Sequence, residues 1–379
     1  MRRALLAVVM VAAALAAPVR PSNAEPTTNG PQVQASSWYL AGEDGAVLAR
    51  HDAARPRAIA SITKLMTAAV VLEQAGLDDV VRVDPRAARI GESTVYLRPG
   101  EELTVADLLR ALLIPSANDA AEALALYVGR GSADAFVELM NAKARELGLS
   151  DTHFENPHGL DERGHVSSAR DVTVLVRYAL GIPFIRETLQ HETLSLPGGR
   201  SFSSTDDLLG EWRPLVGGKT GHTRDAGWSE AAAATRGGAT VYGAVLGSNG
   251  RATRNDALRE LLTYGLSRYR RVQVVDSGRV YAEAKTGYGQ PAVELVALRP
   301  AVRPVRVGTP LVERVVAPTA LALPVAKGER LGRIEVYDGN RLLASSDIVA
   351  ADAVGEAGIL AKARWYTTQT ARNLWEMLT

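Results

Sequence analysis

The chain has 379 residues, of which 46% are hydrophobic, 22% charged and 5% aromatic, and it contains no cysteine. This length is enough for a large core and two or three domains. The formal net charge of +1 gives no indication of nucleic-acid binding, and the lack of cysteine excludes disulfides, cysteine nucleophiles and thiolate metal sites.

The first 24 residues are typical of a secretory signal peptide. Arg2 and Arg3 give a positive start, and residues 4–17 form an apolar run that is too short to span a bilayer comfortably. Ser22-Asn23-Ala24 supplies the small residues that a signal peptidase reads, so we predict cleavage after Ala24 and export of the chain. An uncleaved N-terminal anchor is the alternative.

Strand and helix patterns follow this leader. Residues 37–41 and 46–49 flank Glu43-Asp44-Gly45 and predict a β-hairpin. An apolar helix is expected over residues 61–74. Further helical patterns cover residues 103–113, 119–128, 133–147 and 168–180.

Strand patterns return later in the same region. Residues 228–235 and 240–246 are joined by Gly237-Gly238, which is typical of a hairpin, and a helix is expected over residues 253–267. Strands at both ends with helices between them predict an α+β fold rather than a strict alternation of the two. We therefore expect one domain over residues 25–270.

Helical periodicity disappears beyond that domain. Short apolar runs at residues 293–298, 302–307 and 334–337 are separated by turns that contain Gly, Pro and Asp-Gly-Asn. This pattern predicts a small all-β domain over residues 271–352.

The C-terminal segment, residues 355–379, is predicted to be an amphipathic helix. Trp365 and Trp375 flank its apolar stripe, and Lys362 and Arg372 lie on other faces. A helix with tryptophan and basic residues can lie in a membrane interface, so we favour a membrane anchor. The alternative is a helix docked on its own β domain.

Three short motifs carry the candidate chemistry, and the first is Ser61-Ile62-Thr63-Lys64. A serine and a lysine three positions apart lie on the same face of a helix. A desolvated lysine can lose its proton and activate the hydroxyl as a nucleophile. By itself the pattern is also typical of a helix-capping serine with a solvated lysine.

The second motif is Ser116-Ala117-Asn118, which follows Pro115 between two helical patterns. A loop held between helices can direct short polar side chains into a cleft, where Ser116 can relay a proton and Asn118 can hold a substrate amide. In isolation, a capping loop for the next helix is the simpler interpretation.

The third motif is Lys219-Thr220-Gly221, followed by His222. A strand edge without a side chain at Gly221 lets a peptide lie alongside as an added strand. Lys219 supplies positive charge and Thr220 a hydroxyl for a carboxylate, although a plain turn is the alternative. A second such tripeptide, Lys285-Thr286-Gly287, falls in the β-rich region and is predicted to be a turn.

Together, in this order, the motifs are typical of penicillin-binding proteins and class A β-lactamases. Longer stretches around them resemble the low-molecular-mass penicillin-binding D,D-carboxypeptidases, which are serine peptidases with a β-rich C-terminal domain. The resemblance covers residues 37–267 and continues more loosely to the C-terminus. The matching stretches are residues 60–67, 97–103, 115–120, 158–161, 219–223 and 254–257.

This resemblance implies a β-lactamase-like catalytic domain, in which helices flank an antiparallel sheet beside a helical subdomain. Ser61 would attack the carbonyl between two D-alanines, with Lys64 as the base and Ser116 passing a proton to the leaving amine. The backbone N–H groups of Ser61 and His222 would form the oxyanion hole. The implied substrate-binding residues are Asn118, Lys219, Thr220, Gly221, His222 and Arg254.

The resemblance also implies partners and a location. Peptidoglycan stem peptides would be the substrates, β-lactam antibiotics would acylate Ser61, and no metal or organic cofactor would be needed. The protein is expected outside the cytoplasm, in the periplasm or its equivalent, and peripheral on the outer face of the cytoplasmic membrane.

Two departures from the family pattern concern the wall that binds the carboxylate. Val216-Gly217-Gly218 stands where the family usually has Asp-Gly-x. The arginine expected near Thr205 is missing, and that arginine would help to bind the terminal carboxylate of the substrate. The departures affect substrate preference rather than acylation.

Other interpretations stay open at this point. His153, His158 and His165 lie close together in the sequence and could bind a metal, although their spacing fits no helical ligand pair. Within enzymes, a D,D-endopeptidase or a weak β-lactamase is possible. In a different class, the chain could be an inactive penicillin-binding envelope scaffold.

Overall fold

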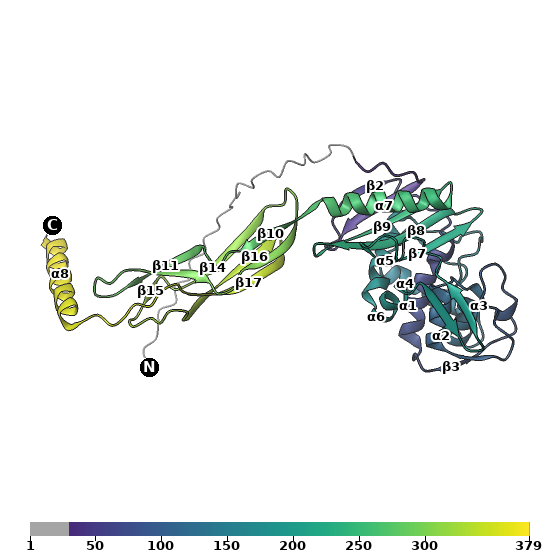
Figure 1. Ribbon diagram of the computed structural model, residues 1–379, viewed down its shortest axis with the longest axis horizontal. Helices are drawn as coiled ribbons and strands as arrows, with labels where there is room; N and C mark the ends of the chain where they lie inside the picture. The colour runs from purple at the N-terminus through teal and green to yellow at the C-terminus, as the bar shows by residue number, and fades with distance from the viewer. Residues whose placement is uncertain (1–29, 379) are drawn as a thin grey trace. The chain divides into compact units, whose positions relative to one another are not determined.

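The computed structural model describes residues 30–378, and the chain divides into two compact units (Figure 1). One unit ends at Arg268 and the other begins at Tyr269. The signal peptide and its cleavage after Ala24 lie outside the described residues, so both stay predictions.

A five-stranded antiparallel sheet forms the centre of the first unit, with the strand order β2-β1-β9-β8-β7. The predicted hairpins β1–β2, at one edge of the sheet, and β8–β9, inside it, are both confirmed. Gly237 and Gly238 turn the chain between β8 and β9 with φ of +60° and +86°, which matches the tight turn expected there. The strands are β1 (Ser37–Gly42), β2 (Val47–His51), β7 (Leu215–Thr223), β8 (Gly227–Arg236) and β9 (Ala239–Ser248).

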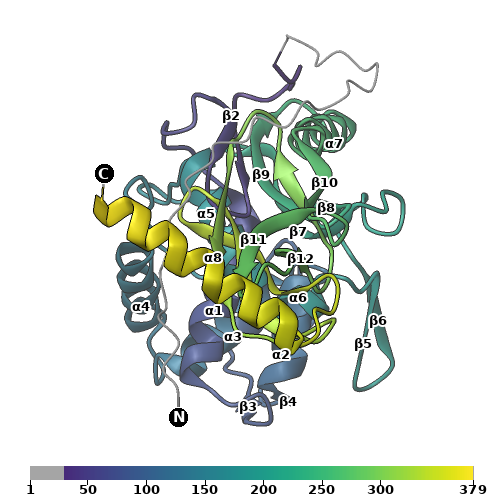
Figure 2. The ribbon, with the colours of Figure 1, turned by 90° about the vertical axis from the view of Figure 1, so that its left-hand side faces the viewer.

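Helices cover both faces of this sheet. Helix α7 (Arg251–Ser267) packs on β8 and β9, while α5 (Ala169–Gly181) packs on β1, β8 and β9 from the other side (Figures 1 and 2). Gly243 on β9 lets α7 approach closely, since a Cβ there would lie 3.2 Å from the Leu262 side chain. The flanked antiparallel sheet predicted for the fold is thereby confirmed.

The helical subdomain is built around α1 (Lys64–Gln74), which packs on four other helices. Residues 64–71 of α1 are all buried, so its first turn is fixed in the core. The other helices in contact with α1 are α2 (Val105–Leu113), α3 (Asn118–Val128), α4 (Ala133–Glu146) and α5.

Several element boundaries differ from the prediction. The helix expected from residue 61 starts as a short 3-10 turn, η1 (Ala60–Thr63), before α1 begins. Residues 103 and 104 belong to β4, and α2 starts after Thr104, whose Oγ1 caps the Asp107 N–H at 3.1 Å. Elements that the sequence analysis missed are β3 (Val80–Arg82), β4 (Glu102–Thr104), α6 (Pro183–Thr188), β5 (Thr193–Leu196), β6 (Arg200–Ser203) and the 3-10 turn η2 (Ala87–Arg89).

The second unit is an all-β domain with its own apolar core, as predicted. A six-stranded sheet in the order β14-β16-β17-β12-β11-β15 lies with the two-stranded pair β10-β13. Leu295, Ile334 and Ile348 are fully buried in its core. The strands are β10 (Tyr269–Val275), β11 (Val280–Thr286), β12 (Val293–Ala297), β13 (Ala301–Arg306), β14 (Leu311–Val316), β15 (Ala320–Leu321), β16 (Arg330–Asp338) and β17 (Arg341–Ala350).

The second Lys-Thr-Gly tripeptide is only partly a turn. Lys285 and Thr286 end strand β11 and pair in parallel with β15, so the prediction is wrong for these two residues. Gly287 begins the turn, which is closed by a hydrogen bond from the Gln290 N–H to the Gly287 carbonyl at 3.3 Å. The tripeptide lies in the β-rich unit, as expected.

The final helix, α8 (Ile359–Leu378), begins four residues later than the segment predicted for it, which started at 355. Trp365 and Tyr366 contact the Tyr288 ring at centroid distances of 5.5 and 5.9 Å, and the Lys362 ammonium lies 5.5 Å from the same ring. Among the described residues, 30–378, no helix is long and apolar enough to cross a membrane.

Candidate active site

Ser61 lies in the 3-10 turn η1, directly before α1, and Lys64 is the first residue of α1. The Lys64 Nζ donates hydrogen bonds to Ser61 Oγ at 2.8 Å, to Asn118 Oδ1 at 2.6 Å and to the His158 carbonyl at 2.8 Å. Lys64 is fully buried. The structure therefore places the serine and lysine of the first motif in direct contact, and it adds Asn118 of the second.

Burial lowers the pKa of Lys64 well below its ordinary value, and the positive charge of Lys219 acts in the same direction. Glu92 and Asp119 oppose this effect. A lysine amine that is neutral near physiological pH has a lone pair that can accept a proton from a hydrogen-bonded hydroxyl. The Lys64–Ser61 contact thus has the geometry of a base and a nucleophile.

Ser116 lies in the loop between α2 and α3 with a backbone φ of +66°, in the left-handed region that non-glycine residues seldom adopt. Its Oγ is buried and has no hydrogen-bond partner in the protein. Strained residues with unpaired polar atoms cluster at functional sites. Ser116 is therefore held with a hydroxyl available for a ligand or a reacting group.

Asn118 begins helix α3, and both ends of its side-chain amide are fixed. Its Oδ1 accepts from Lys64, and its Nδ2 donates to the Gly91 carbonyl at 3.0 Å. The orientation of the amide follows from the Gly91 carbonyl, which only accepts hydrogen bonds and so must face the amide nitrogen.

Strand β7 is an edge strand of the central sheet, and it passes very close to the nucleophile turn. A Cβ at Gly221 would lie 2.7 Å from the Ile59 carbonyl oxygen and 3.2 Å from the Ser61 nitrogen. Glycine is thus required here for contact with η1. The sequence pattern favoured glycine here for a different reason, namely room for a peptide bound alongside the strand. This binding of a peptide stays a prediction, and the position of β7 at the edge of the sheet is compatible with it.

Lys219 is 1% exposed and donates a hydrogen bond from Nζ to the Thr220 carbonyl at 3.0 Å. Burial lowers its pKa to about 7, while the nearby carboxyl groups of Asp206 and Glu230 act to raise it. A buried ammonium beside an open strand edge is suited to bind an anionic group.

Thr205 lies beside Thr220, with their Oγ1 atoms 2.7 Å apart. This is the region in which the resemblance implies an arginine. The two hydroxyls therefore replace a guanidinium at the wall expected to bind a carboxylate. The second departure from the family pattern is Val216-Gly217-Gly218, and there the register of β7 against β8 shifts between Leu215 and Gly217.

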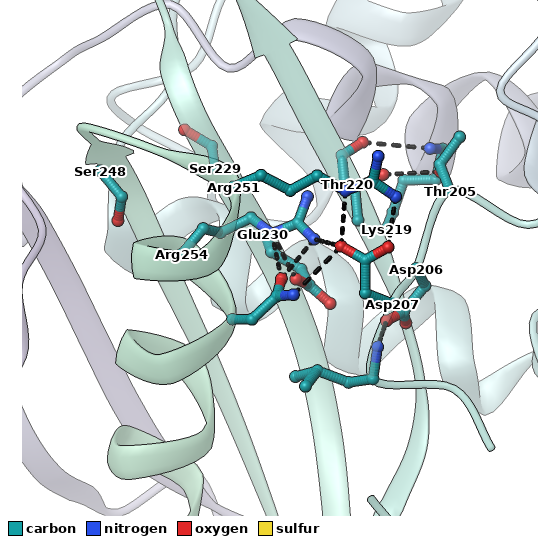
Figure 3. A network of polar contacts seen from close by, with 12 residues as sticks. Thr205, Asp206, Asp207, Lys219, Thr220, Ser229, Glu230, Ser248, Arg251 and Arg254 are labelled. Atoms are coloured by element: carbon teal, nitrogen blue, oxygen red, sulfur yellow. Dashed lines mark hydrogen bonds and ion pairs between the residues drawn. The ribbon is translucent and has the colours of Figure 1, made fainter. Parts of the chain in front are cut away.

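Arg254 does not present a free guanidinium. It is 2% exposed, its Nε lies 3.0 Å from Glu230 Oε2, and its Nη2 lies 3.1 Å from Asp207 Oδ2 (Figure 3). Its Cζ is also 6.0 Å from the centre of the Trp228 ring, which stacks on His222 at 4.1 Å. The geometry favours a positioning role for Arg254 over direct contact with a substrate.

The histidines that suggested a metal site make other contacts. His165 Nε2 lies 2.8 Å from Thr63 Oγ1, and its Nδ1 accepts from the Glu155 N–H at 3.1 Å. Burial lowers the pKa of His158 to about 3 and that of His165 to about 4, so both are neutral at physiological pH. Over residues 30–378, no group of three or more His, Cys, Asp or Glu residues is arranged to hold a metal ion.

The polar network behind strand β7 was missed by the sequence analysis. It comprises Asp206, Asp207 and Glu230 around Arg254 (Figure 3). One feature of the sequence points to this network: Glu230 is an acidic residue within a strand, residues 228–235, whose other side chains are mostly small and apolar. Buried charges are almost always paired, so this acid indicated a partner.

Family models match both units of the chain. Residues 24–250 match the family model described as D-alanyl-D-alanine carboxypeptidase, Peptidase S11, and residues 269–356 match the model described as the C-terminal domain of penicillin-binding protein 5. The chain is 32% identical over 351 residues to the D-alanyl-D-alanine carboxypeptidase DacD of Salmonella typhimurium, covering 88% of this chain and 89% of that one.

The solved structures that are similar to the chain include two of known proteins. Penicillin-binding protein 5 from Haemophilus influenzae superposes with a TM-score of 0.64 at 27% identity, covering 87% of this chain and all of the other. The Streptomyces K15 DD-transpeptidase superposes with a TM-score of 0.60 at 31% identity, covering 63% of this chain and all of the other.

Proposed function

The chain belongs to the family of serine-type D-alanyl-D-alanine carboxypeptidases, and from that premise we propose that it removes the terminal D-alanine from peptidoglycan pentapeptides through an acyl-enzyme on Ser61. The observation that carries the proposal is the 2.8 Å contact between Lys64 Nζ and Ser61 Oγ, at a lysine whose pKa burial lowers well below its ordinary value. The family consists of exported cell-wall enzymes. The model that matches the second unit is named for penicillin-binding protein 5.

In the proposed acylation step, Ser61 Oγ attacks the carbonyl carbon of the penultimate D-alanine while its proton passes to neutral Lys64 Nζ. The backbone N–H groups of Ser61 and His222 stabilise the oxyanion. The peptide bond then breaks, and the proton held by Lys64 is returned through Ser116, which gives its own proton to the amine of the departing D-alanine and takes up that of Lys64. Water subsequently hydrolyses the ester on Ser61, which releases the shortened peptide and restores the enzyme.

The terminal carboxylate of the substrate binds at the wall formed by Lys219, Thr220 and Thr205 in this proposal. Lys219 supplies the charge, and the paired hydroxyls of Thr220 and Thr205, 2.7 Å apart, supply hydrogen bonds. This arrangement assigns to two threonines the task that an arginine has in the usual family pattern.

Replacement of Thr205 by valine tests this assignment. Valine keeps the size of the side chain but removes the hydroxyl that contacts Thr220. Because one hydrogen bond to a charged carboxylate is lost, KM is expected to rise about tenfold with kcat nearly unchanged. Steady-state kinetics on a D-Ala-D-Ala peptide would show this, and an unaltered KM would remove Thr205 from the carboxylate pocket.

The activity itself is tested with purified residues 25–379 and two substrates. We expect D-alanine release from a pentapeptide ending in D-Ala-D-Ala, and covalent labelling by a fluorescent penicillin. Faster cleavage of a cross-linked peptide dimer than of the pentapeptide would favour the endopeptidase instead. Labelling without release of D-alanine would favour the inactive scaffold, and no labelling would contradict the proposal.

We also propose that helix α8 places the enzyme on the outer face of the cytoplasmic membrane. Ile359 and Leu360 at its start are 87% and 88% exposed, and Trp375 near its end is 70% exposed. Exposed aliphatic and tryptophan side chains with basic residues on other faces are typical of interfacial helices.

A sedimentation experiment with anionic lipid vesicles checks the membrane proposal. Residues 25–379 are expected to pellet with the vesicles, while a chain ending at Val354, which retains both units, is expected to stay in the supernatant. The double substitution Ile359→Ser, Leu360→Ser should weaken pelleting, whereas Thr367→Ser, Thr368→Ser, on the same helix, should not. Equal pelleting of the long and short chains would instead favour a helix that only docks on the β domain.

A further inference from the structure

Two carboxyl groups lie buried together behind the wall that carries Lys219. Glu230 on β8 is fully buried and Asp206, in the loop before β7, is 8% exposed. Their carboxyl groups are within hydrogen-bonding reach of each other. Glu230 Oε1 and Asp206 Oδ2 have no hydrogen-bond donor from the protein, while Glu230 Oε2 faces Arg254 Nε in an ion pair at 3.0 Å.

The position of these acids in the sheet is fixed by register. Glu230 lies directly opposite Thr220 in the β7–β8 pairing, and Asp206 follows Thr205, which contacts Thr220. Both acids are therefore brought next to the threonine pair. Neither has a place in the acylation step described above.

The carboxyl pair lies among buried basic groups. The cations nearby are Lys219 and Arg254, both almost fully buried, and Asp207 already neutralises part of this charge through Arg254. Arg251, which is half exposed, pairs with the outer side of Asp207. The case for a retained proton is local, because two ionised carboxylates held close together in the interior, with no donor between them, repel each other.

Two carboxyl groups in direct contact resolve this by retaining a proton between them. The protonated member donates to the ionised member, which satisfies oxygens that otherwise have no donor. Burial, with the neighbouring Asp206, raises the pKa of Glu230 well above its ordinary value, and burial also raises that of Asp206. Glu230 Oε2 keeps its 3.0 Å ion pair with Arg254 Nε.

We propose that Asp206 and Glu230 share one proton and one negative charge, and that this charge keeps Lys219 cationic so that it can bind the carboxylate of the substrate. They are positioning residues, since they act through Lys219. The inference rests on the function proposed above only for the identity of the ligand. Other charges that act on this region are those of Arg254, Arg251, Asp207 and, through Lys219, Lys64.

A direct test follows the titration of Lys219 by NMR. The chain contains six lysines, so lysine labelled at the ε position gives few signals, and the signal absent from Lys219→Arg identifies Lys219. The singles Asp206→Asn and Glu230→Gln each leave one acid that carries the shared charge, so the midpoint of Lys219 should move little. The double variant removes the charge, and the midpoint should fall to clearly lower pH.

Three results would overturn the inference. One is a double variant in which Lys219 titrates as in the wild type. Another is an equal downward shift in each single variant, which would mean two independent charges. If the double variant does not fold, infrared spectra decide the matter: the wild type should show a protonated carboxyl band at neutral pH that disappears in Glu230→Gln, and its absence would contradict the sharing.

Kinetics then connect the pair to substrate binding. At neutral pH the double variant should show a KM about ten- to a hundredfold higher for a peptide ending in a free carboxylate, with a smaller effect on the C-terminal amide. Lowering the pH should reprotonate Lys219 and reduce the difference, which a merely structural defect would not do. Asp256→Asn with Glu260→Gln, exposed acids on α7, is the matched control.

The NMR result and the activity result are separable. If the protein releases no D-alanine but Lys219 titrates as expected, the proposed function fails and the charge-sharing pair stands. If D-alanine is released normally by the double variant at every pH, the pair is not required for carboxylate binding, and the inference fails while the function stands.

Discussion

Replacing Ser61 with alanine is expected to abolish both D-alanine release and covalent labelling by penicillin. Removal of a serine nucleophile reduces kcat by a factor on the order of 10⁶, which leaves only the contribution of binding and the oxyanion hole. The effect should be this large because Ser61 is the only side chain that the proposal allows to form a bond with the substrate. Release of D-alanine, followed by chromatography, and gel fluorescence measure the two activities.

The control for this variant must show that the fold is intact. Ser61 is only partly buried and contacts Lys64, so alanine should leave the melting temperature close to that of the wild type. Ser132→Ala is a useful counterpart, since this serine caps helix α4 by accepting from the Ala135 N–H at 3.2 Å. Its loss should reduce the free energy of unfolding by about 1 kcal/mol without changing turnover. Residual labelling of Ser61→Ala would identify another nucleophile.

Replacing Lys64 with arginine is expected to reduce kcat/KM by about 10² to 10⁴, the usual contribution of a general base. Arginine keeps the positive charge but does not lose its proton at any accessible pH. The comparison therefore separates two roles, because a lysine that acted only by its charge could be replaced by arginine at lower cost. Stopped-flow acylation by a chromogenic β-lactam measures this step alone.

The pH dependence of kcat/KM tests the same role of Lys64 as a base. The folded pKa of Lys64 is lowered, so the fraction of neutral amine increases as pH rises, and kcat/KM should increase with it. At higher pH the cation on Lys219, whose pKa is about 7, is lost and substrate binding should weaken. A bell-shaped profile is expected. A kcat/KM that falls steadily from acid to neutral pH would contradict the role of Lys64 as a base.

The fold was predictable where local patterns determine it. The hairpins β1–β2 and β8–β9 follow from alternating strands and from Gly237-Gly238, and the later helices follow from apolar periodicity and capping residues. The short hairpin β5–β6 was not predictable, because its strands have four residues each and too little periodicity to separate them from a loop.

The identities of the site residues were predictable from the sequence, but the distances between their side chains were not. Motif order brought Ser61, Lys64 and Asn118 together as candidates, yet their convergence on one ammonium depends on the packing of α1 against α3. The left-handed backbone at Ser116 follows from the tight turn between two helices and leaves no mark in the sequence pattern.

Arg254 shows what the sequence alone leaves undetermined, namely the contacts that a side chain makes. Its family context indicated a substrate-binding side chain, whereas its guanidinium is buried against Glu230, which lies on another element. No local pattern links a residue on α7 to one on β8, since their contact depends on how the helix packs across the sheet. Whether Arg254 affects substrate binding through Trp228 and His222 stays a prediction.

The central claim is that Ser61 is the nucleophile, and peptide mapping after reaction with penicillin tests it most directly. Purified protein, residues 25–379, is treated with penicillin, digested, and the mass of each peptide is measured. We predict one penicilloyl adduct per chain, located on Ser61. An adduct on Ser116 or on any other residue, or a protein that carries no adduct after prolonged treatment, would contradict the account.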